Sequence, residues 1–418
     1  MQKDITVQSR RGLDWMNFFL ADVRDGVGPY LAIFLLASQN WSSSDIGLVM
    51  GAMGVATGLA QIPAGKWMDS VRNKRLLLSG ACGVVAIACP LMALYPVMWV
   101  VLPAQIAIGA AAAFILPGIA SLTLGLVGHR QLAGHTGRNE VFNHAGNIVA
   151  ALLAGAVGYF IANEYIFWVV SLWSLFSIVS VMTIRPSEVD DAQARGAERG
   201  SAGEIHIAKF LPLLKNRNIL IFATVVMLFH FGNAAMLPLV GQQLSTQANG
   251  EGASLWMSAC IILAQLVMIP IAKFAGKYVD IWGTRPVFMI ALVALPIRGV
   301  LYTLSDAPMY LLAVQMLDGV GAGIFGVIWV LVVADLTKGS GHYSLTLGLM
   351  NVAHMVGFFL SQTTAGRVVD TAGSFSAGFL YLAAVAGLAL LLFAVAMPET
   401  RTLGLGGRLK GKSDTALT

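Results

Sequence analysis

Ionisable and amide side chains interrupt several otherwise apolar segments of this chain. In "FFLADVRDGVGPYLAIFLL", residues 18–36, three charged residues stand among aliphatic and aromatic ones: Asp22, Arg24 and Asp25. Comparable interruptions occur at Asn143, His144, Asn147, His230, Asn233, Asp318, Asn351 and His354. Carboxylates and imidazoles in apolar surroundings can take up and release protons, bind a polar solute or coordinate a metal. The elements that carry them decide which chemistry is possible.

The spacing of these residues is helical. Pairs three residues apart share one face of a helix, and the chain has four such pairs: Asp22/Asp25, His144/Asn147, His230/Asn233 and Asn351/His354. A carboxyl group in a semi-dry cavity favours its protonated form, whereas a nearby arginine favours the ionised form. Asp22 or Asp25 could therefore carry a proton while Arg24 neutralises the other. We interpret Arg298 as a snorkelling side chain and leave it out of this set.

The composition is that of an integral membrane protein. Of the 418 residues, 57% are hydrophobic and only 11% are charged, and the mean hydropathy is +0.75. Soluble domains carry about 25% charged residues. Apolar runs of about 20 residues can cross a bilayer, and we predict twelve such helices at 14–37, 45–65, 75–95, 99–125, 139–161, 164–184, 218–241, 252–272, 286–304, 308–334, 343–366 and 375–397.

Basic residues indicate the orientation of these helices. All but Arg24, Arg298 and Arg367 of the 26 Lys and Arg residues fall in segments that share one side of the membrane when both termini are cytoplasmic. Short cytoplasmic loops are enriched in Lys and Arg. We therefore expect a multi-pass protein of the bacterial inner membrane with both termini cytoplasmic, and we interpret the positive net charge as topology rather than nucleic-acid binding.

The chain divides into two similar halves. We predict a six-helix bundle at 1–184, a cytoplasmic linker with an amphipathic segment at 185–217, a second bundle at 218–400 and a cytoplasmic tail at 401–418. "GKWMDS" at Gly65 recurs as "GKYVDI" at Gly276, "QIAIGAAAA" at Gln105 recurs as "QMLDGVGAG" at Gln315, and His144 recurs as His354. Such parallel repeats place a substrate site at their interface near the middle of the membrane.

These motifs resemble the major facilitator superfamily. The family's loop signature, roughly Gly-x-Leu-x-Asp-Arg-x-Gly-Arg-Lys, is approximated by "GKWMDSVRNK" and again by "GKYVDIWGTR". The resemblance covers the whole chain and implies an all-α membrane fold in which twelve transmembrane helices form two parallel six-helix repeats around a central cavity. It also implies that the first, fourth, seventh and tenth spans line this cavity, with the second, fifth, eighth and eleventh at the interface of the halves.

The two signature loops predict a gate. We place Asp69 and Asp280 where a helix ends at the inner surface, beside basic residues that can pair with them, and we expect a glycine in each copy to let helices approach closely. The gating residues that we predict are Gly65, Asp69, Lys74, Gly276, Asp280 and Arg285. In the family such pairs are thought to hold the inner face closed.

Two functions remain open on the sequence. The first is secondary active transport by alternating access: proton-coupled export, by antiport, of a small drug-like or siderophore-like organic solute. The alternative is transport of a divalent metal such as iron, or of a metal chelate, with Asp22, Asp25, His230 and His354 as ligands. No nucleophile–base signature or nucleotide-binding loop indicates an enzyme. We expect a monomer in the lipid bilayer that binds its solute and protons, without a cofactor and without nucleic acid.

Overall fold

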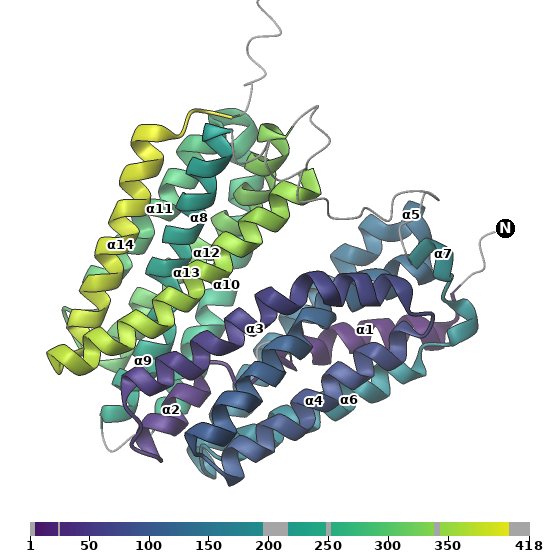
Figure 1. The fold of residues 1–418 in the computed structure, drawn as a ribbon, viewed down its shortest axis with the longest axis horizontal. Coiled ribbons are helices and arrows are strands. Elements are labelled where there is room, and N and C mark those ends of the chain that lie inside the picture. Colours follow the sequence, from purple (N-terminus) through teal and green to yellow (C-terminus); the bar gives the residue numbers. More distant parts are fainter. Residues whose placement is uncertain (1–4, 24–25, 195–215, 248–251, 338–342, 401–418) are drawn as a thin grey trace, which may run out of the picture. The chain divides into compact units, whose positions relative to one another are not determined.

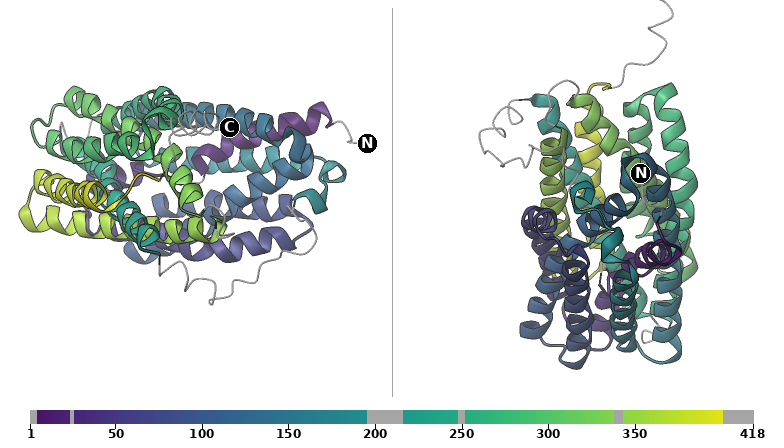
Figure 2. Two further views of the ribbon diagram at one scale, coloured as in Figure 1. Left: turned by 90° about the horizontal axis from the view of Figure 1, so that it is seen from above. Right: turned by 90° about the vertical axis from the view of Figure 1, so that its right-hand side faces the viewer.

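The computed structural model describes residues 5–23, 26–194, 216–247, 252–337 and 343–400, and these residues form helices without any β-strand (Figures 1 and 2). The elements are α1 (Val7–Val23), α2 (Tyr30–Ala37), α3 (Ser43–Ser70), α4 (Lys74–Leu94), α5 (Met98–Phe160), α6 (Tyr165–Thr183), the short 3₁₀ helix η1 (Pro186–Glu188), α7 (Asp191–Ala194), α8 (Arg217–Asn233), α9 (Met236–Thr246), α10 (Ala253–Trp282), α11 (Thr284–Leu301), α12 (Pro308–Leu336), α13 (Tyr343–Ala372) and α14 (Phe375–Ala396). The predicted all-helical membrane fold is confirmed.

Ten described helical segments are long and apolar enough to cross a membrane. They include both parts of α5, which turns at Gly128, where φ is +68°. The predicted first span is divided between two shorter helices, α1 and α2, and the predicted eleventh span is α13, which is interrupted by several polar and charged residues. The helices extend beyond the predicted spans at several ends because polar residues continue the helix past its apolar part.

The first helix of each half is broken at the corresponding place. α1 ends at Val23 and α2 begins at Tyr30, and between them Gly26 and Gly28 have φ angles of +60° and +53°. Glycine suits this left-handed backbone because it has no Cβ. In the second half, α8 and α9 are separated only by Ala234, which keeps helical φ and ψ angles of −63° and −35°, and Ala235, whose amide donates to Ser361 Oγ at 2.9 Å. Both breaks follow polar residues that the sequence indicated as candidate site residues.

The described structure packs as two compact units. Unit 1 contains Met1–Glu204 together with Leu237–Ile262 and Gln362–Asp370, and unit 2 contains Ile205–Met236, Leu263–Ser361 and Thr371–Thr418. In unit 1, α5 packs on α1, α3 and α4, and α6 packs on α1 and α4; in unit 2, α11 packs on α12 and α14, and α14 packs on α8. The division of the chain into halves on either side of a linker at 185–217 stays a prediction.

Equivalent glycines bring helices together in the two halves. A Cβ atom on Gly146 of α5 would lie 1.9 Å from the carbonyl oxygen of Phe18 on α1, and a Cβ on Gly357 of α13 would lie 2.2 Å from that of Met227 on α8. Contacts this short leave no room for a side chain, so both positions need glycine. The internal repeat seen in the sequence therefore corresponds to repeated helix packing.

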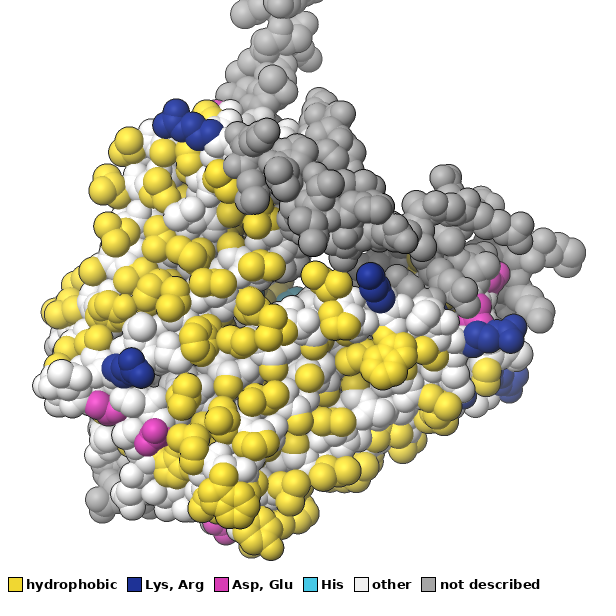
Figure 3. Space-filling view, viewed as in Figure 1, with side chains coloured by type: hydrophobic (Ala, Val, Ile, Leu, Met, Phe, Trp, Pro, Cys, Tyr) yellow, Lys and Arg dark blue, Asp and Glu magenta, His cyan; other side chains and the backbone are white. Residues whose placement is uncertain are grey.

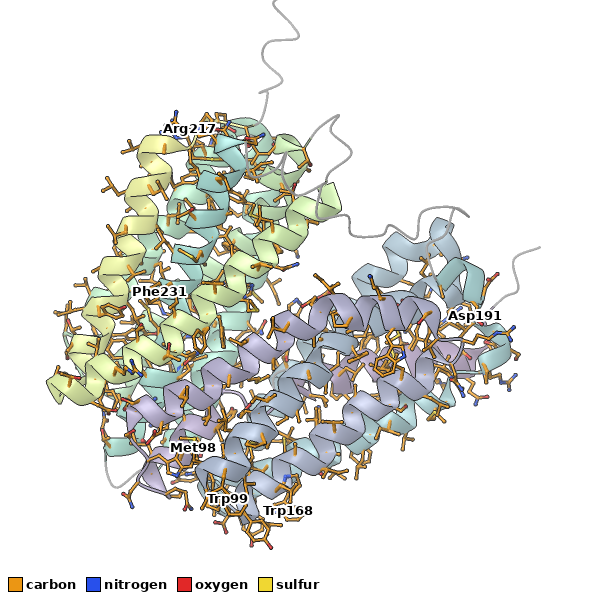
Figure 4. The ribbon with its side chains drawn as sticks, viewed as in Figure 1. Met98, Trp99, Trp168, Asp191, Arg217 and Phe231 are labelled. Carbon is orange, nitrogen blue, oxygen red and sulfur yellow. The ribbon has the colours of Figure 1, made fainter. Side chains whose placement is uncertain are left out.

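The surface of each unit suits a lipid environment. In Figure 3, hydrophobic side chains are spread over the described surface, and charged side chains are few on the face that it shows. In Figure 4, the exposed Trp99 and Trp168 lie toward one end of unit 1 and Asp191 lies toward the other. Tryptophan is enriched where a membrane meets water, so this end of unit 1 has the composition of a membrane interface.

Candidate functional site

A buried polar cluster in unit 2 centres on Arg298 of α11. Its side chain is 1% exposed and forms an ion pair with Asp318 of α12, whose side chain is 20% exposed. Arg298 Nη1 also donates to Asn233 Oδ1 at 2.7 Å, and Nη2 donates to Gln315 Oε1 at 3.2 Å. Gln315 Nε2 donates to Asp318 Oδ2 at 2.9 Å. We call these four residues, with Tyr302, the Arg298 cluster.

Tyr302, the residue directly after α11, contacts two members of the cluster. Arg298 Nε donates to the Tyr302 hydroxyl at 3.1 Å, and this hydroxyl donates to Gln315 Oε1. The guanidinium carbon lies 5.4 Å from the centroid of the Tyr302 ring. Burial of a charge is costly unless the charge is paired and hydrogen-bonded, and this cluster supplies both kinds of partner.

The interpretation of Arg298 as a snorkelling side chain is wrong. Because its guanidinium is directed into the helix bundle, it joins two predicted site residues, Asn233 and Asp318. The sequence contained a usable signal. An arginine and an aspartate in consecutive spans connected by a short turn can pair, and Gln315 lies on the same face as Asp318. Gln315 and Tyr302 were not predicted as site residues.

Two predicted histidines form a ring stack in unit 2. The rings of His230 on α8 and His354 on α13 lie 3.7 Å apart between centroids and are inclined by only 11°. His230 also meets the Phe325 ring edge-on, at 4.8 Å and 83°. Within the described part of the chain, Nε2 of His230 is buried and has no hydrogen-bond partner. Asn351, one turn before His354, is exposed.

This stack does not have the geometry of a shared metal site. The lone pairs of imidazole nitrogens lie in the ring planes, so two nearly parallel rings direct them side by side rather than toward one ion. Among the described residues, no group of three His, Cys, Asp or Glu side chains is placed to hold a metal. The metal alternative stays a prediction without support from the described residues, and Asp25, one of its four ligands, lies outside them.

The other predicted site residues belong to unit 1. Asp22, partly exposed, lies in the last turn of α1 beside the break between α1 and α2. Arg24 and Asp25 lie outside the described residues. On α5, Asn147 Nδ2 donates to Asn143 Oδ1 at 3.1 Å, and His144 is partly exposed.

Four of the predicted gate residues lie close to the ends of helices. Gly65 and Asp69 lie in the last two turns of α3, and Gly276 and Asp280 lie in the last two turns of α10, as we expect for the two aspartates. A Cβ atom on either Gly65 or Gly276 would meet open space within its unit. The expected close helix contact at these two glycines is therefore absent from the described packing of each unit.

The predicted basic partners cap helices. Lys74 is buried, and its Nζ donates to the carbonyl oxygens of Met68 at 2.6 Å and Val71 at 3.3 Å, at the end of α3. Arg285 Nη2 donates to the carbonyl oxygen of Ala394, at the end of α14. Cationic groups stabilise the C-terminal ends of helices, where carbonyl groups lack partners. A gating role for these residues stays a prediction.

Unit 1 also contains hydrogen bonds that join distant parts of the chain. The Tyr30 hydroxyl on α2 lies 2.7 Å from Ser258 Oγ on α10, and Ser43 Oγ at the start of α3 donates to Gln242 Oε1 on α9 at 2.6 Å. The carboxylate of Asp370 on α13 accepts the backbone amides of Ser43 at 3.1 Å and Ser44 at 2.7 Å. The sequence did not predict these contacts because single serine and tyrosine residues carry no spacing signal.

One carboxyl group outside the membrane spans has a perturbed pKa. Burial of Glu188, in η1, raises its pKa, but hydrogen bonds from Ser9 and Thr6 and the charge of Arg185 together hold this pKa below its ordinary value. Thr6 donates to Glu188 Oε2 through its amide at 3.2 Å and through its hydroxyl at 3.1 Å. The ionised carboxylate thus links Thr6, directly before α1, to η1, which follows α6.

Comparisons with known proteins agree with this architecture. The family model of the Major Facilitator Superfamily matches residues 13–278 and 251–413. An MFS-type transporter found in two strains of Mycobacterium tuberculosis is 44% identical over 392 residues, 93% of each chain, and Multidrug resistance protein 1 of Bacillus subtilis is 24% identical over 45% of this chain and 49% of its own. The crystal structure of the nucleoside transporter NupG superposes with a TM-score of 0.76 at 16% identity, covering 92% of this chain and 98% of NupG. The chain therefore belongs to the major facilitator superfamily of transporters.

Proposed function

We propose that this transporter couples the export of a small organic solute to the opposite movement of protons. The observation that carries the proposal is the pair of corresponding helix breaks, between α1 and α2 and between α8 and α9. In secondary transporters, interrupted helices of related repeats form the sites for substrate and coupling ion. Here Asp22 lies at the first break and Asn233 at the second.

The two breaks differ in chemistry, which suggests different roles. Asp22 can gain and lose a proton, and it is the carboxylate that we assign to coupling. Asn233 cannot titrate in the physiological range, but it belongs to the Arg298 cluster, where Asp318 is partly exposed. We assign this cluster to the polar end of the solute, because a fixed set of donors and acceptors orients a ligand.

The names of two similar proteins support the direction and the solute class. A distant relative is named a multidrug resistance protein, and a structural neighbour is named a nucleoside transporter. Both names refer to organic compounds. We place the protein in the bacterial inner membrane as a monomer with both termini cytoplasmic, since this orientation agrees with the distribution of Lys and Arg.

Reconstitution into proteoliposomes tests the proposal. A thermal-shift screen first identifies a solute, and a ligand at 100 times its Kd should add about 2.7 kcal/mol to the free energy of unfolding. The screen includes ethidium, adenosine, a ferric catecholate chelate and Fe²⁺. With the identified solute, an imposed pH gradient should drive uptake against the solute gradient.

The variant Asp22→Asn should lose pH-driven flux but retain exchange of solute between equal concentrations, because exchange needs no net proton movement. Asp191→Asn, which removes a carboxylate from α7 outside the membrane spans, is the matched control and should transport normally. Undiminished pH-driven flux in Asp22→Asn would remove the proton role of this residue. Stabilisation by Fe²⁺ alone would favour the metal alternative.

A further inference from the structure

The ring stack of unit 2 continues beyond the two histidines. Phe229 and Phe325 are stacked at 4.7 Å with an angle of 17°, and Phe325 and Trp329 follow at 5.8 Å and 24°. His230 touches both phenylalanines edge-on. Rings from α8, α12 and α13 thus form one assembly, which we call the ring ladder: His354, His230, Phe229, Phe325 and Trp329.

The ring ladder has an accessible side on α12. Phe229 and Phe325 are buried, but Trp329 is partly exposed, and Ala322 and Gly326 are exposed on the same helix face. A Cβ atom on Gly326 would meet no heavy atom within 4 Å. Because residues three and four apart lie on one face of a helix, Gly326 and Trp329 lie on the same face of α12. A flat group can lie there.

A polar group of the ring ladder is left without a partner. Nε2 of His230 is buried and lacks a hydrogen-bond partner within the described residues. Buried polar atoms in native proteins almost always have a partner, so an exception requires an explanation. A ligand that presents a hydrogen-bonding edge in the plane of the His230 ring would provide one.

The Arg298 cluster lies near the same rings. Asn233 is one helical turn from His230 on α8, and Asp318 is two turns from Phe325 on α12, about 10 Å along the axis. Aromatic faces and a polar cluster therefore occur within the length of a small molecule. Flat rings bind by stacking on aromatic side chains, and hydrogen bonds at their edges give orientation.

We propose that the ring ladder binds the solute, and that the solute is a planar nitrogen heteroaromatic compound with a polar substituent. Its ring lies against Trp329 over Gly326, its edge pairs with His230 Nε2 in the plane of the imidazole, and its substituent reaches the Arg298 cluster. This inference rests on the proposed function for the transport step, but it concerns binding and is tested by binding.

Two matched pairs of compounds test the ring requirement with the purified full chain. Adenosine is compared with ribose, which lacks the heteroaromatic ring, and ethidium is compared with tetraethylammonium, which carries the same charge without a flat ring. Isothermal titration calorimetry gives each Kd. At least one aromatic member should bind, and its non-aromatic counterpart should bind at least tenfold more weakly. Failure of both aromatic compounds to bind, or equal Kd values within each pair, would overturn the proposal.

Three variants test the residues. Trp329→Ala should raise the Kd of the aromatic compound by roughly 5- to 150-fold, the range for one stacked ring. Trp282→Ala is the matched control, because Trp282 belongs to a separate ring group on α10, with Tyr278 at 4.5 Å, and its Kd should equal that of the wild type. His230→Phe keeps a ring but removes the nitrogen, so it should also weaken binding about 5-fold or more. Equal Kd values for Trp329→Ala and Trp282→Ala would contradict the assignment.

The outcomes separate this inference from the proposed function. If the pH gradient drives flux of a non-aromatic solute while the aromatic compounds do not bind, the inference fails and the proposed function stands. If the aromatic compounds bind through Trp329 and His230 but no solute is moved by a pH gradient, the proposed function fails and the inference stands. Size-exclusion chromatography of each variant checks that it is folded. Because Trp329 is partly exposed and His230 is packed among rings, Trp329→Ala should disturb folding less than His230→Phe.

Discussion

Removal of the negative charge from the Arg298 cluster should destabilise the protein strongly. In Asp318→Asn, the guanidinium of Arg298 keeps its bonds to Asn233 and Gln315 but loses its counter-charge while only 1% exposed. Breaking a buried ion pair by removal of one partner costs about 3–5 kcal/mol. Because Asp318 is 20% exposed and two neutral acceptors remain, we expect about 3 kcal/mol, the lower end of this range.

A second ion pair in the same chain provides the control. Arg138 forms two hydrogen bonds with Asp14, at 2.6 and 2.7 Å, but the Arg138 side chain is 49% exposed. In Asp14→Asn, water can solvate the arginine that has lost its partner. The expected loss is therefore below about 1 kcal/mol, the range for exposed pairs.

The measurement is the free energy of unfolding in detergent micelles, from denaturant titrations followed by tryptophan fluorescence. The double variant Arg298→Met/Asp318→Leu leaves no uncompensated charge in the bundle. It should therefore lose less free energy of unfolding than a variant in which only Arg298 or only Asp318 is replaced. Equal losses for Asp318→Asn and Asp14→Asn would refute the reasoning that burial makes the Arg298 pair costly to break.

Three further predictions test packing, pH dependence and topology. Gly146→Ala should prevent folding or cost several kcal/mol, whereas Gly83→Ala, whose Cβ meets open space, should have little effect on yield and melting temperature. Because the folded-state pKa of Glu188 is lowered, the ionised group stabilises the protein above its unfolded pKa, and this contribution is lost as pH falls. Melting temperatures between about pH 5 and pH 2 should therefore fall less in Glu188→Gln than in the wild type, and equal slopes would contradict this. A cysteine at Ser38 should react with an impermeant reagent from outside the cell and one at Arg72 should not; the reverse would overturn the orientation.

The helices were largely predictable, because apolar length and helical spacing report a local property of the chain. What the sequence could not give was the pairing of single polar residues between helices. The sequence indicates a snorkelling Arg298, because an arginine near the end of a span often snorkels, and only the packing of α11 on α12 directs it to Asp318. His230 and His354 were both selected, but their face-to-face stacking depends on the crossing of α8 and α13 and has no signature in spacing.

The signature motif illustrates a different limit. A motif identifies residues but not their local geometry, and the apolar runs of the sequence stop at or before "GKWMDS" and "GKYVDI". In the structure the helices continue through both motifs. Charge alone predicts that Lys74 and Arg285 can pair with aspartates, and the structure adds that each also donates to backbone carbonyls at a helix end. Every residue has a backbone carbonyl, so the sequence alone does not show which carbonyl groups these side chains contact.

The two halves preserve one backbone plan while their chemistry has diverged. Both contain a broken first helix and a glycine that admits a neighbouring backbone. Gln315 is bound within the Arg298 cluster, whereas its counterpart Gln105 is buried with an Oε1 atom that has no hydrogen-bond partner among the described residues. The first half has no arginine at the position equivalent to Arg298, where Ala88 stands. A symmetric pair of sites would bind the same ligand twice, but this asymmetry permits two different ligands. It is the physical reason for assigning the proton to Asp22 and the solute to unit 2.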